Sequence, residues 1–214
     1  DNEKAYRIQL DNNGGLLLFF YTINIATVNN TYLPPRFGEN NILAKRTADS
    51  NEYQDGYKTA FLLKYDTQDG NLTWRKDLQG LVNSGNMWSD VGSSHMDSQG
   101  ILHAILGFPQ GTHLDGLVTV PSSFSNSYQY FMVKFNGDGV IQGTPQVLPI
   151  TGFTNSLNGE THLLYDETLN RYYFAGSRRN SDNSYTPLSY NGSAFTRDAF
   201  VLAFNGATLA EEWR

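Results

Sequence analysis

The chain has 214 residues, a formal net charge of −6 and no cysteine, and it is long enough to bury a substantial core without disulfides or metal ions. Its 15 lysines and arginines form no basic run interleaved with exposed aromatic residues, which argues against binding to nucleic acid or to an anionic membrane. No apolar run approaches the roughly 20 residues that span a bilayer, so we expect no membrane span.

The composition favours short strands over helices. The 20 glycines, 13 tyrosines and 13 phenylalanines accompany many Asn, Asp and Ser residues, and we expect almost no helix. From the N-terminus, residues 6–10 alternate between apolar and polar, residues 11–15 form a turn and residues 16–21 are continuously apolar, which predicts a β-hairpin. Similar hairpins follow at residues 94–107 and at residues 162–176.

A second type of hairpin also occurs three times. Residues 61–66 (FLLKYD) lead through a polar turn to residues 71–74 (NLTW), and the first motif returns as residues 131–136 (FMVKFN) and 200–205 (FVLAFN). The leading phenylalanines are 131 − 61 = 70 and 200 − 131 = 69 residues apart. Such regular spacing indicates an internal repeat.

Each repeat therefore contains four predicted strands, with a long connection between the second and the third. The strands are predicted at about 5–10, 15–22, 58–65 and 71–78, then 93–97, 101–107, 129–136 and 140–148, then 161–165, 171–176, 198–205 and 208–214. Asp11 and Asp97, which precede the first turns, are 97 − 11 = 86 residues apart, and this interval exceeds 70 by 16. We assign the surplus to residues 22–58, a predicted surface insertion in the first repeat.

The second and third strands of each repeat are apolar at consecutive positions, so both of their faces must be covered. Four-stranded antiparallel sheets of this kind, repeated along a chain, describe the blades of a β-propeller. We therefore predict one all-β segment, residues 1–214, of three such blades at about 1–80, 81–150 and 151–214. The long connections of these meanders all lie at one end of the sheets, where we expect a binding site: 22–57, 79–92, 108–128, 149–160 and 177–197.

Three stretches of the sequence resemble a known repeat. Residues 61–74, 97–107 (DSQGILHAILG) and 198–205 (DAFVLAFN) are similar to the bacterial-type β-propeller repeat called SBBP, whose core reads roughly D-x-x-G-N-x-Y-x-x-G, D-A-F-V-x-K-x-D and G-N-x-x-W. The resemblance covers the hairpins but not the long loops. Ala203 replaces the lysine of the repeat, and Thr144 replaces its tryptophan. The resemblance implies a propeller of secreted or surface proteins, usually without known catalysis.

Three blades do not close a propeller ring, which takes four to eight. We expect further blades in a longer parent chain, or an assembly of several subunits, because uncovered apolar faces favour association or aggregation. The sequence starts without a methionine or a signal peptide, which favours a processed or excised part of a longer protein. Asn29, Asn71 and Asn191 begin Asn-x-Ser/Thr triplets, and these predicted glycosylation sites favour an extracellular or cell-surface location.

The predicted loop face is rich in aromatic residues with neighbouring amides. Trp88, Tyr128, Tyr185 and Tyr190 are the candidates for ligand binding, because such rings stack on sugars or grip a protein. Packing of the long loops onto the blades explains the same rings equally well.

Signals for metals and cofactors are weak. The turn that contains Asp66 and Asp69 offers oxygen ligands for calcium, although an ordinary hairpin turn demands the same residue types, and we favour the turn. No histidine pair has the spacing of a zinc motif. His103 lies in an apolar strand, and we expect it to be buried, hydrogen-bonded and aligned with Tyr172 of the next repeat.

The sequence thus predicts a non-enzymatic, extracellular β-propeller segment that acts in structure, adhesion or assembly, through its long-loop face or its blade edges. Its expected partners are copies of itself or further blades, with carbohydrate as an additional ligand class. The alternative is a lectin, or a carbohydrate-active or quinone-dependent enzyme with its site on the same face. Its acid–base residues would then come from Asp90, Asp115, Glu160, His95 and His162.

Overall fold

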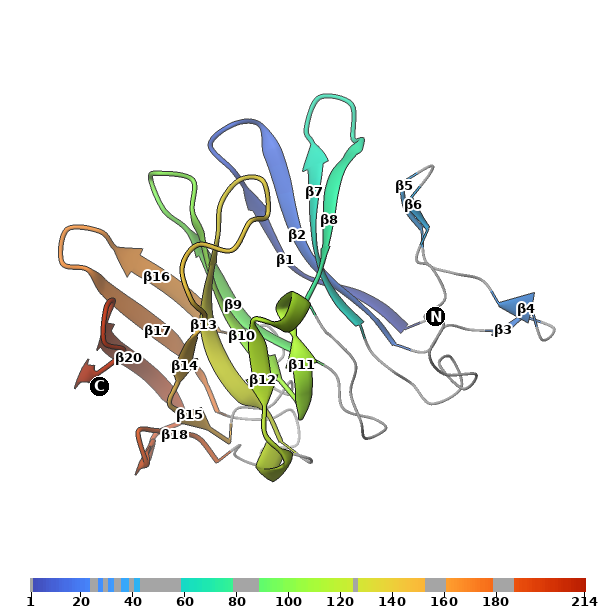
Figure 1. Cartoon of the computed structure of the whole chain (residues 1–214). Coiled ribbons are helices and arrows are strands. Elements are labelled where there is room, and N and C mark those ends of the chain that lie inside the picture. Colours follow the sequence, from blue (N-terminus) through green and yellow to red (C-terminus); the bar gives the residue numbers. More distant parts are fainter. Residues whose placement is uncertain are drawn as a thin grey trace. The chain divides into compact units, whose positions relative to one another are not determined.

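The computed structural model describes residues 2–23, 27–28, 31–32, 36–38, 41–42, 59–78, 89–124, 127–152, 161–178 and 187–214. Within these ranges the chain is all-β, with antiparallel sheets, two short 3-10 turns and no α-helix, as predicted (Figure 1). The contacts divide the chain into two compact units. One comprises Asp1–Ser89 and Pro109–Ser125, and the other comprises Asp90–Phe108 and Asn126–Arg214.

The first unit is built on a four-stranded antiparallel meander in the order β1-β2-β7-β8. Its strands are β1 (Asn2–Leu10), β2 (Gly15–Ile23), β7 (Thr59–Asp66) and β8 (Leu72–Asp77), close to the predicted ranges. The carboxylate of Asp11 closes the first turn by accepting hydrogen bonds from the amides of Asn13 and Gly15. Its second oxygen lies 2.7 Å from Lys64 Nζ, so the lysine of the third strand neutralises this buried turn.

The predicted insertion contributes one described side chain, that of Phe37, to a face of this sheet. It contains two short hairpins, β3 (Thr27–Val28) with β4 (Thr31–Tyr32) and β5 (Arg36–Gly38) with β6 (Asn41–Ile42).

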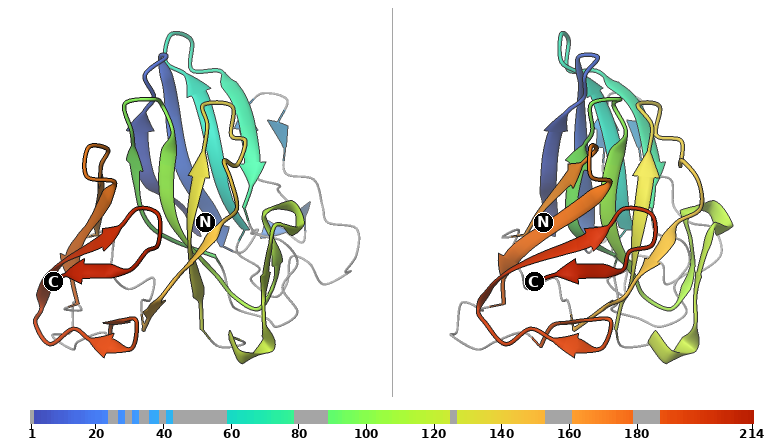
Figure 2. Two further views of the ribbon diagram at one scale, coloured as in Figure 1. Left: turned by 60° about the vertical axis from the view of Figure 1, so that its left-hand side comes forward. Right: turned by 90° about the vertical axis from the view of Figure 1, so that its left-hand side faces the viewer.

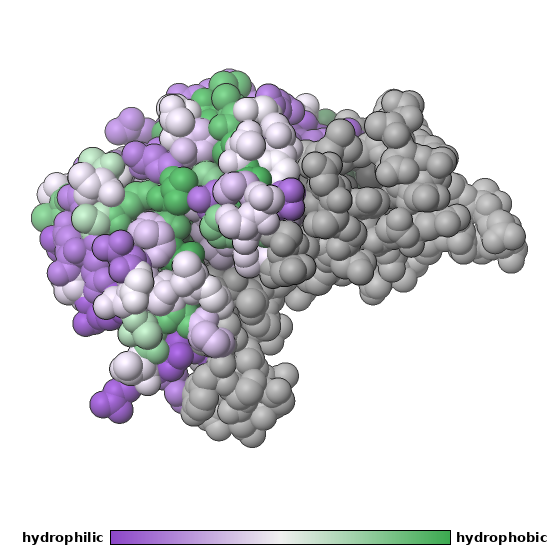
Figure 3. Space-filling model, turned by 60° about the horizontal axis from the view of Figure 1, so that its bottom comes forward, coloured by the Kyte–Doolittle hydropathy of each residue, from purple (hydrophilic) through white to green (hydrophobic). Residues whose placement is uncertain are grey.

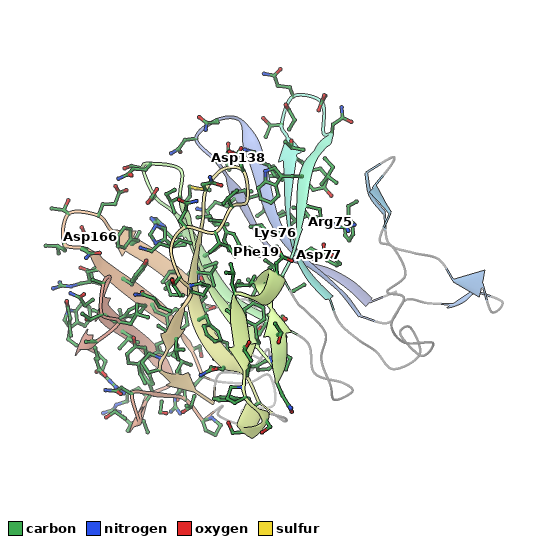
Figure 4. The ribbon with its side chains drawn as sticks, viewed as in Figure 1. Phe19, Arg75, Lys76, Asp77, Asp138 and Asp166 are labelled. Carbon is green, nitrogen blue, oxygen red and sulfur yellow. The ribbon has the colours of Figure 1, made fainter. Side chains whose placement is uncertain are left out.

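Phe37, in β5, packs on the sheet. Its ring centroid lies 4.8 Å from that of Phe61, and its carbonyl accepts a hydrogen bond from the Tyr65 hydroxyl at 2.9 Å. The guanidinium of Arg75 lies 5.4 Å from the Phe37 ring and 5.7 Å from the Phe61 ring, and Figure 4 labels it on β8. Phe37 thus shields Phe61 from water.

A hairpin that the sequence did not predict also belongs to the first unit. It joins β11 (Gly111–His113) to β12 (Val118–Val120), with 3-10 turns at η1 (Leu114–Gly116) and η2 (Ser122–Phe124). It is fixed to the end of β8 because the Leu114 amide donates to the Leu78 carbonyl at 3.1 Å. Lys76 Nζ and Asp115 Oδ2 form an ion pair at 2.9 Å.

The second unit contains two more four-stranded antiparallel meanders (Figures 1 and 2). The strands of the first are β9 (Asp90–Met96), β10 (Leu102–Phe108), β13 (Gln129–Phe135) and β14 (Gln146–Leu148). The strands of the second are β16 (His162–Asp166), β17 (Arg171–Ser177), β20 (Ala199–Asn205) and β21 (Glu211–Trp213). The predicted strand at 140–148 differs from the structure, because only residues 146–148 form a ladder and Ile141 makes a single bridge to Phe135.

The two sheets of the second unit pack face to face. Ile105 and Met132 of the second repeat share one core with Tyr172, Phe174 and Leu202 of the third. Burial of these large side chains is the main stabilising term.

Polar contacts between the two sheets join residues one repeat apart in the sequence. The Ser98 amide donates to Glu167 Oε1 at 2.7 Å, and Thr161 Oγ1 donates to the Gly92 carbonyl. In each pair the two residues are 69 positions apart. Residues that lie one sequence repeat apart therefore contact each other between the two sheets.

The two meanders differ in how their faces are covered. Every residue of β10 is buried, so both faces of the second sheet are covered, as predicted. In β20, by contrast, Phe200 is buried and Val201 is 46% exposed, and Leu164 and Trp213 are 52% and 45% exposed. One face of the third sheet is therefore exposed in this structure, whereas both faces of the second are covered.

The contact of Phe37 with the first sheet can be tested by substitution. Phe37→Ala should lower the free energy of unfolding by about 3 kcal/mol, because it uncovers Phe61 and leaves a cavity. Urea denaturation followed by tryptophan fluorescence measures this loss. Val140→Ala is the control, because Val140 is exposed and its truncation should cost less than about 0.5 kcal/mol. Equal effects of the two substitutions would contradict the packing role of Phe37.

Candidate functional site

Two long connections of the second unit meet in a small sheet at one end of the meanders. β15 (Ile150–Thr151) pairs with β18 (Ser189–Tyr190), which pairs in turn with β19 (Ser193–Ala194). Asn191 and Gly192 connect β18 and β19 with φ angles of 49° and 77°. Positive φ at both central residues is the reason that Asn-Gly favours tight hairpins. The structure thus brings segments 149–160 and 177–197 together, as predicted from the meander.

This small sheet borders a pocket of about 360 Å³. The pocket is lined by Thr151, Gly152, Arg178, Pro187, Leu188, Ser189, Ala194 and Phe195. Its lining is largely apolar and includes two hydroxyls and a guanidinium, the combination typical of sites for small ligands or peptide side chains. In the space-filling view of Figure 3, hydrophobic and hydrophilic residues are interspersed over the part of the surface that is coloured.

Hydrogen bonds of its lining side chains help to hold this pocket in place. Arg178 Nε donates to the Arg197 carbonyl at 2.7 Å, and Thr151 Oγ1 lies 2.5 Å from Ser189 Oγ. Gly152 has a φ of 78°, and a Cβ there would lie 1.9 Å from the Pro187 carbonyl oxygen. The two walls therefore approach so closely that only glycine fits.

Only part of the predicted aromatic surface lies in the described residues. Trp88 and Tyr185 lie outside them. Tyr128 is half-buried, with its ring centroid 6.1 Å from that of Tyr130. Tyr190 is fully buried, and its hydroxyl donates to the Leu209 carbonyl at 2.5 Å. Tyr190 therefore packs the core of the second unit and offers no surface to a ligand.

The candidate acid–base residues occupy different environments. Asp90 is buried and accepts a hydrogen bond from the Tyr130 hydroxyl at 3.0 Å, and this burial raises the pKa of Asp90 to about 6. Asp115 is exposed and pairs with Lys76. Burial also lowers the pKa of His95, whereas His162 is exposed, and Glu160 lies outside the described residues. No hydrogen bond joins any two of these groups in the described chain.

A buried polar network lies between the second and third sheets instead. His103 Nε2 lies 3.1 Å from Asp97 Oδ2, and His103 Nδ1 lies 2.6 Å from the Tyr172 hydroxyl. The imidazole stacks on Tyr165 with centroids 4.5 Å apart. Burial lowers the pKa of His103, so the neutral imidazole is favoured. The buried His103 and its alignment with Tyr172 were predicted, whereas the Asp97 partner was not.

In the turn that contains the calcium candidates, the carboxylate oxygens accept hydrogen bonds from the backbone amides of the same turn. Asp66 Oδ1 accepts the Gln68 amide at 2.7 Å, and Asp69 Oδ1 accepts the Asn71 amide at 2.8 Å. The hydrogen bonds from Asn71 hold the pKa of Asp69 below its usual value. No group of three or more potential metal ligands occurs among the described residues. Figure 4 labels Asp138 in the corresponding turn of the second repeat, which follows β13, and Asp166 at the end of β16.

Two of the three predicted glycosylation sites fall in the described chain. Asn71 and Asn191 are both exposed in hairpin turns, and Asn29 lies outside the described residues. No helix in the described part is long and apolar enough to cross a membrane.

The comparisons with known proteins return no match, neither to a protein-family model nor to a curated protein. The resemblance to the SBBP repeat therefore rests on the sequence motifs quoted above.

Asp90 predicts a pH-dependent effect on stability. An unfolded aspartate titrates near pH ~3.9 and folded Asp90 near 6, so ionising this buried group costs folding free energy as the pH rises between those values. As the pH rises from 4 to 7.5, the free energy of unfolding of Asp90→Asn should therefore increase by about 2–3 kcal/mol relative to that of the wild type. Urea denaturation at both pH values measures the difference. Asp138→Asn, at an exposed turn, should show no such change. A pH-independent effect of Asp90→Asn would refute the buried, ionisable environment.

Proposed function

We propose that this chain is a non-enzymatic, extracellular β-propeller segment that assembles with other copies of itself, through the open face of its third sheet. Three consecutive four-stranded meanders with a period of about 70 residues support the propeller architecture, which also agrees with the SBBP resemblance. The exposed Asn71 and Asn191 turns are compatible with glycosylation outside the cell.

The observation that carries the proposal is the open face itself. In the second sheet Ile105 pairs with Met132, and in the third sheet Ala175 pairs with Val201 at the corresponding positions. Ile105 and Met132 are 0% and 2% exposed, whereas Val201 is 46% exposed. The equivalent positions of the first repeat, Phe19 and Leu62, are also buried. The same face is thus covered in two repeats and open in the third.

The open face is suited to contact with another copy. Leu164 and Trp213 expose apolar surface on it, and the Tyr173 ring packs against Trp213 at 5.9 Å. Arg171 and Glu212 at its border pair with each other, so this charge is already compensated. Apolar patches with compensated charge at the border are typical of protein interfaces.

The enzyme alternative has less support. Asp90 is enclosed in the core, and the described candidates His95, His162 and Asp115 form no hydrogen bond with it or with each other. A catalytic pair needs its acid and base within reach of one substrate. The pocket beside Arg178 instead gives the long-loop end of the second unit a place for a small ligand or a peptide side chain.

Sedimentation velocity over a range of protein concentrations tests the assembly. Wild type should self-associate in the micromolar range, and Val201→Glu should shift the equilibrium towards monomer by placing an uncompensated charge in the interface. Val140→Glu is the matched control, since Val140 is similarly exposed but lies in the turn after β13. A wild type that stays monomeric at all concentrations, or equal effects of the two substitutions, would refute the proposal.

A further inference from the structure

A second pocket of about 360 Å³ opens within the second unit, where the turns of the third repeat approach the outer edge of the second sheet. Its lining residues are Met132, Lys134, Gln142, Gly143, Thr144, Gln146, Asn170, Gly206 and Ala207. This pocket is separate from the one beside Arg178, since the two share no lining residue.

The pocket lies where the second repeat departs from the other two. In the first repeat Trp74 pairs with Lys64, and in the third Trp213 pairs with Ala203. By sequence offset the corresponding residue of the second repeat is Thr144, 13 residues after Phe131 as Trp74 is after Phe61. The structure does not pair Thr144 with Lys134, because the Lys134 carbonyl accepts the Gln142 amide at 2.8 Å instead. A threonine leaves the volume of an indole unfilled, and Thr144 indeed lines the pocket.

The backbone around Thr144 has also left the sheet. Gly143 has a φ of 71° and Pro145 has no amide hydrogen, so neither continues a strand ladder. The ladder of β14 begins only at Gln146. The missing indole and the interrupted strand together open this edge of the sheet.

Lys134 gives the pocket a positive charge, and no carboxylate of the described residues forms an ion pair with it. In the first repeat the equivalent Lys64 pairs with Asp11 at 2.7 Å. In the second repeat the corresponding aspartate, Asp97, instead contacts His103. The Lys134 ammonium lies 5.9 Å from the centre of the Tyr165 ring, and it has no ion pair with any residue that the structure describes.

Three amide side chains line the pocket together with Lys134, and each uses one end within the protein. Gln142 Nε2 donates to the Val140 carbonyl at 3.1 Å, and Gln146 Nε2 donates to the Ala207 carbonyl at 3.3 Å. Asn170 Oδ1 accepts the Tyr165 hydroxyl at 2.8 Å. These contacts hold the amides while their remaining carbonyl and amino groups suit the hydroxyls of a ligand.

The far wall of the pocket is rigid. The Gly206 amide donates to the Asn170 carbonyl at 2.7 Å, and a Cβ at Gly206 would lie 2.1 Å from Asn170 Oδ1. Glycine is therefore required where these two turns of the third repeat meet.

We propose that this pocket binds a small polyhydroxylated carboxylate, of the size and chemistry of a sugar acid. Lys134 pairs with the carboxylate, Gln142, Gln146 and Asn170 bind hydroxyls, and Met132 contacts the carbon skeleton. A volume of about 360 Å³ lies at the lower end of the range of ligand pockets and accommodates a single sugar ring.

Titration of the isotope-labelled chain with D-glucuronate, followed by amide chemical shifts, tests the proposal. Glucuronate should bind in the millimolar range and shift the amides of Gln142, Thr144 and Asn170. D-glucose lacks the charge and acetate lacks the hydroxyls, so both should bind at least about tenfold more weakly. No binding of glucuronate, or equal binding of glucose or acetate, would overturn the assignment.

Two substitutions locate the site. Lys134→Met removes the charge but keeps an unbranched side chain, and should weaken glucuronate binding about tenfold or more. Thr144→Trp restores the residue of the other repeats and should abolish binding by filling the pocket, while the amide spectrum reports that the fold persists. Lys76→Met, in the first unit, should leave affinity unchanged. Undiminished binding by both Lys134→Met and Thr144→Trp would refute the site.

Discussion

Face-to-face packing of consecutive repeats is the interaction on which the second unit depends. A meander of four strands has two broad faces, and its second and third strands are too apolar for either face to remain in water. The second sheet satisfies this requirement by burying Ile105 and Met132 against Tyr172 and Phe174 of the third. In the third sheet the equivalent position, Val201, is exposed, so the same rule makes that face suited to association.

Departures from the repeat coincide with the features that distinguish one sheet from another. The insertion of the first repeat supplies Phe37, which packs against Phe61 on a face of the first sheet. In the second repeat, Thr144 in place of tryptophan opens a pocket next to Lys134. The repeated residues form the scaffold, and residues that deviate from the repeat can form binding surfaces. Prediction from local sequence patterns is expected to fail at such residues.

The sequence alone predicts most of the strands, but it does not predict the pockets. A period of about 70 residues and runs of apolar residues predicted nearly every strand, because each pattern is local. The fourth strand of the second repeat was predicted too long, although Gly143 and Pro145 mark the interruption. Asn191-Gly192 is a hairpin signal that lies within the predicted glycosylation triplet. Both pockets, and the contact of Asp97 with His103, join residues from separate hairpins, and their geometry has no local signature.

The hydrogen bond between His103 and Tyr172, 69 residues apart, provides the most direct test that consecutive sheets are stacked. A double-mutant cycle with His103→Leu, which places there the residue found at the equivalent Leu17, and Tyr172→Phe measures the coupling in urea denaturation. Stacked sheets predict a coupling energy of about 1 kcal/mol or more, because the two side chains share a buried hydrogen bond. Additivity within about 0.3 kcal/mol would mean that the two residues do not touch, and would contradict the stacking.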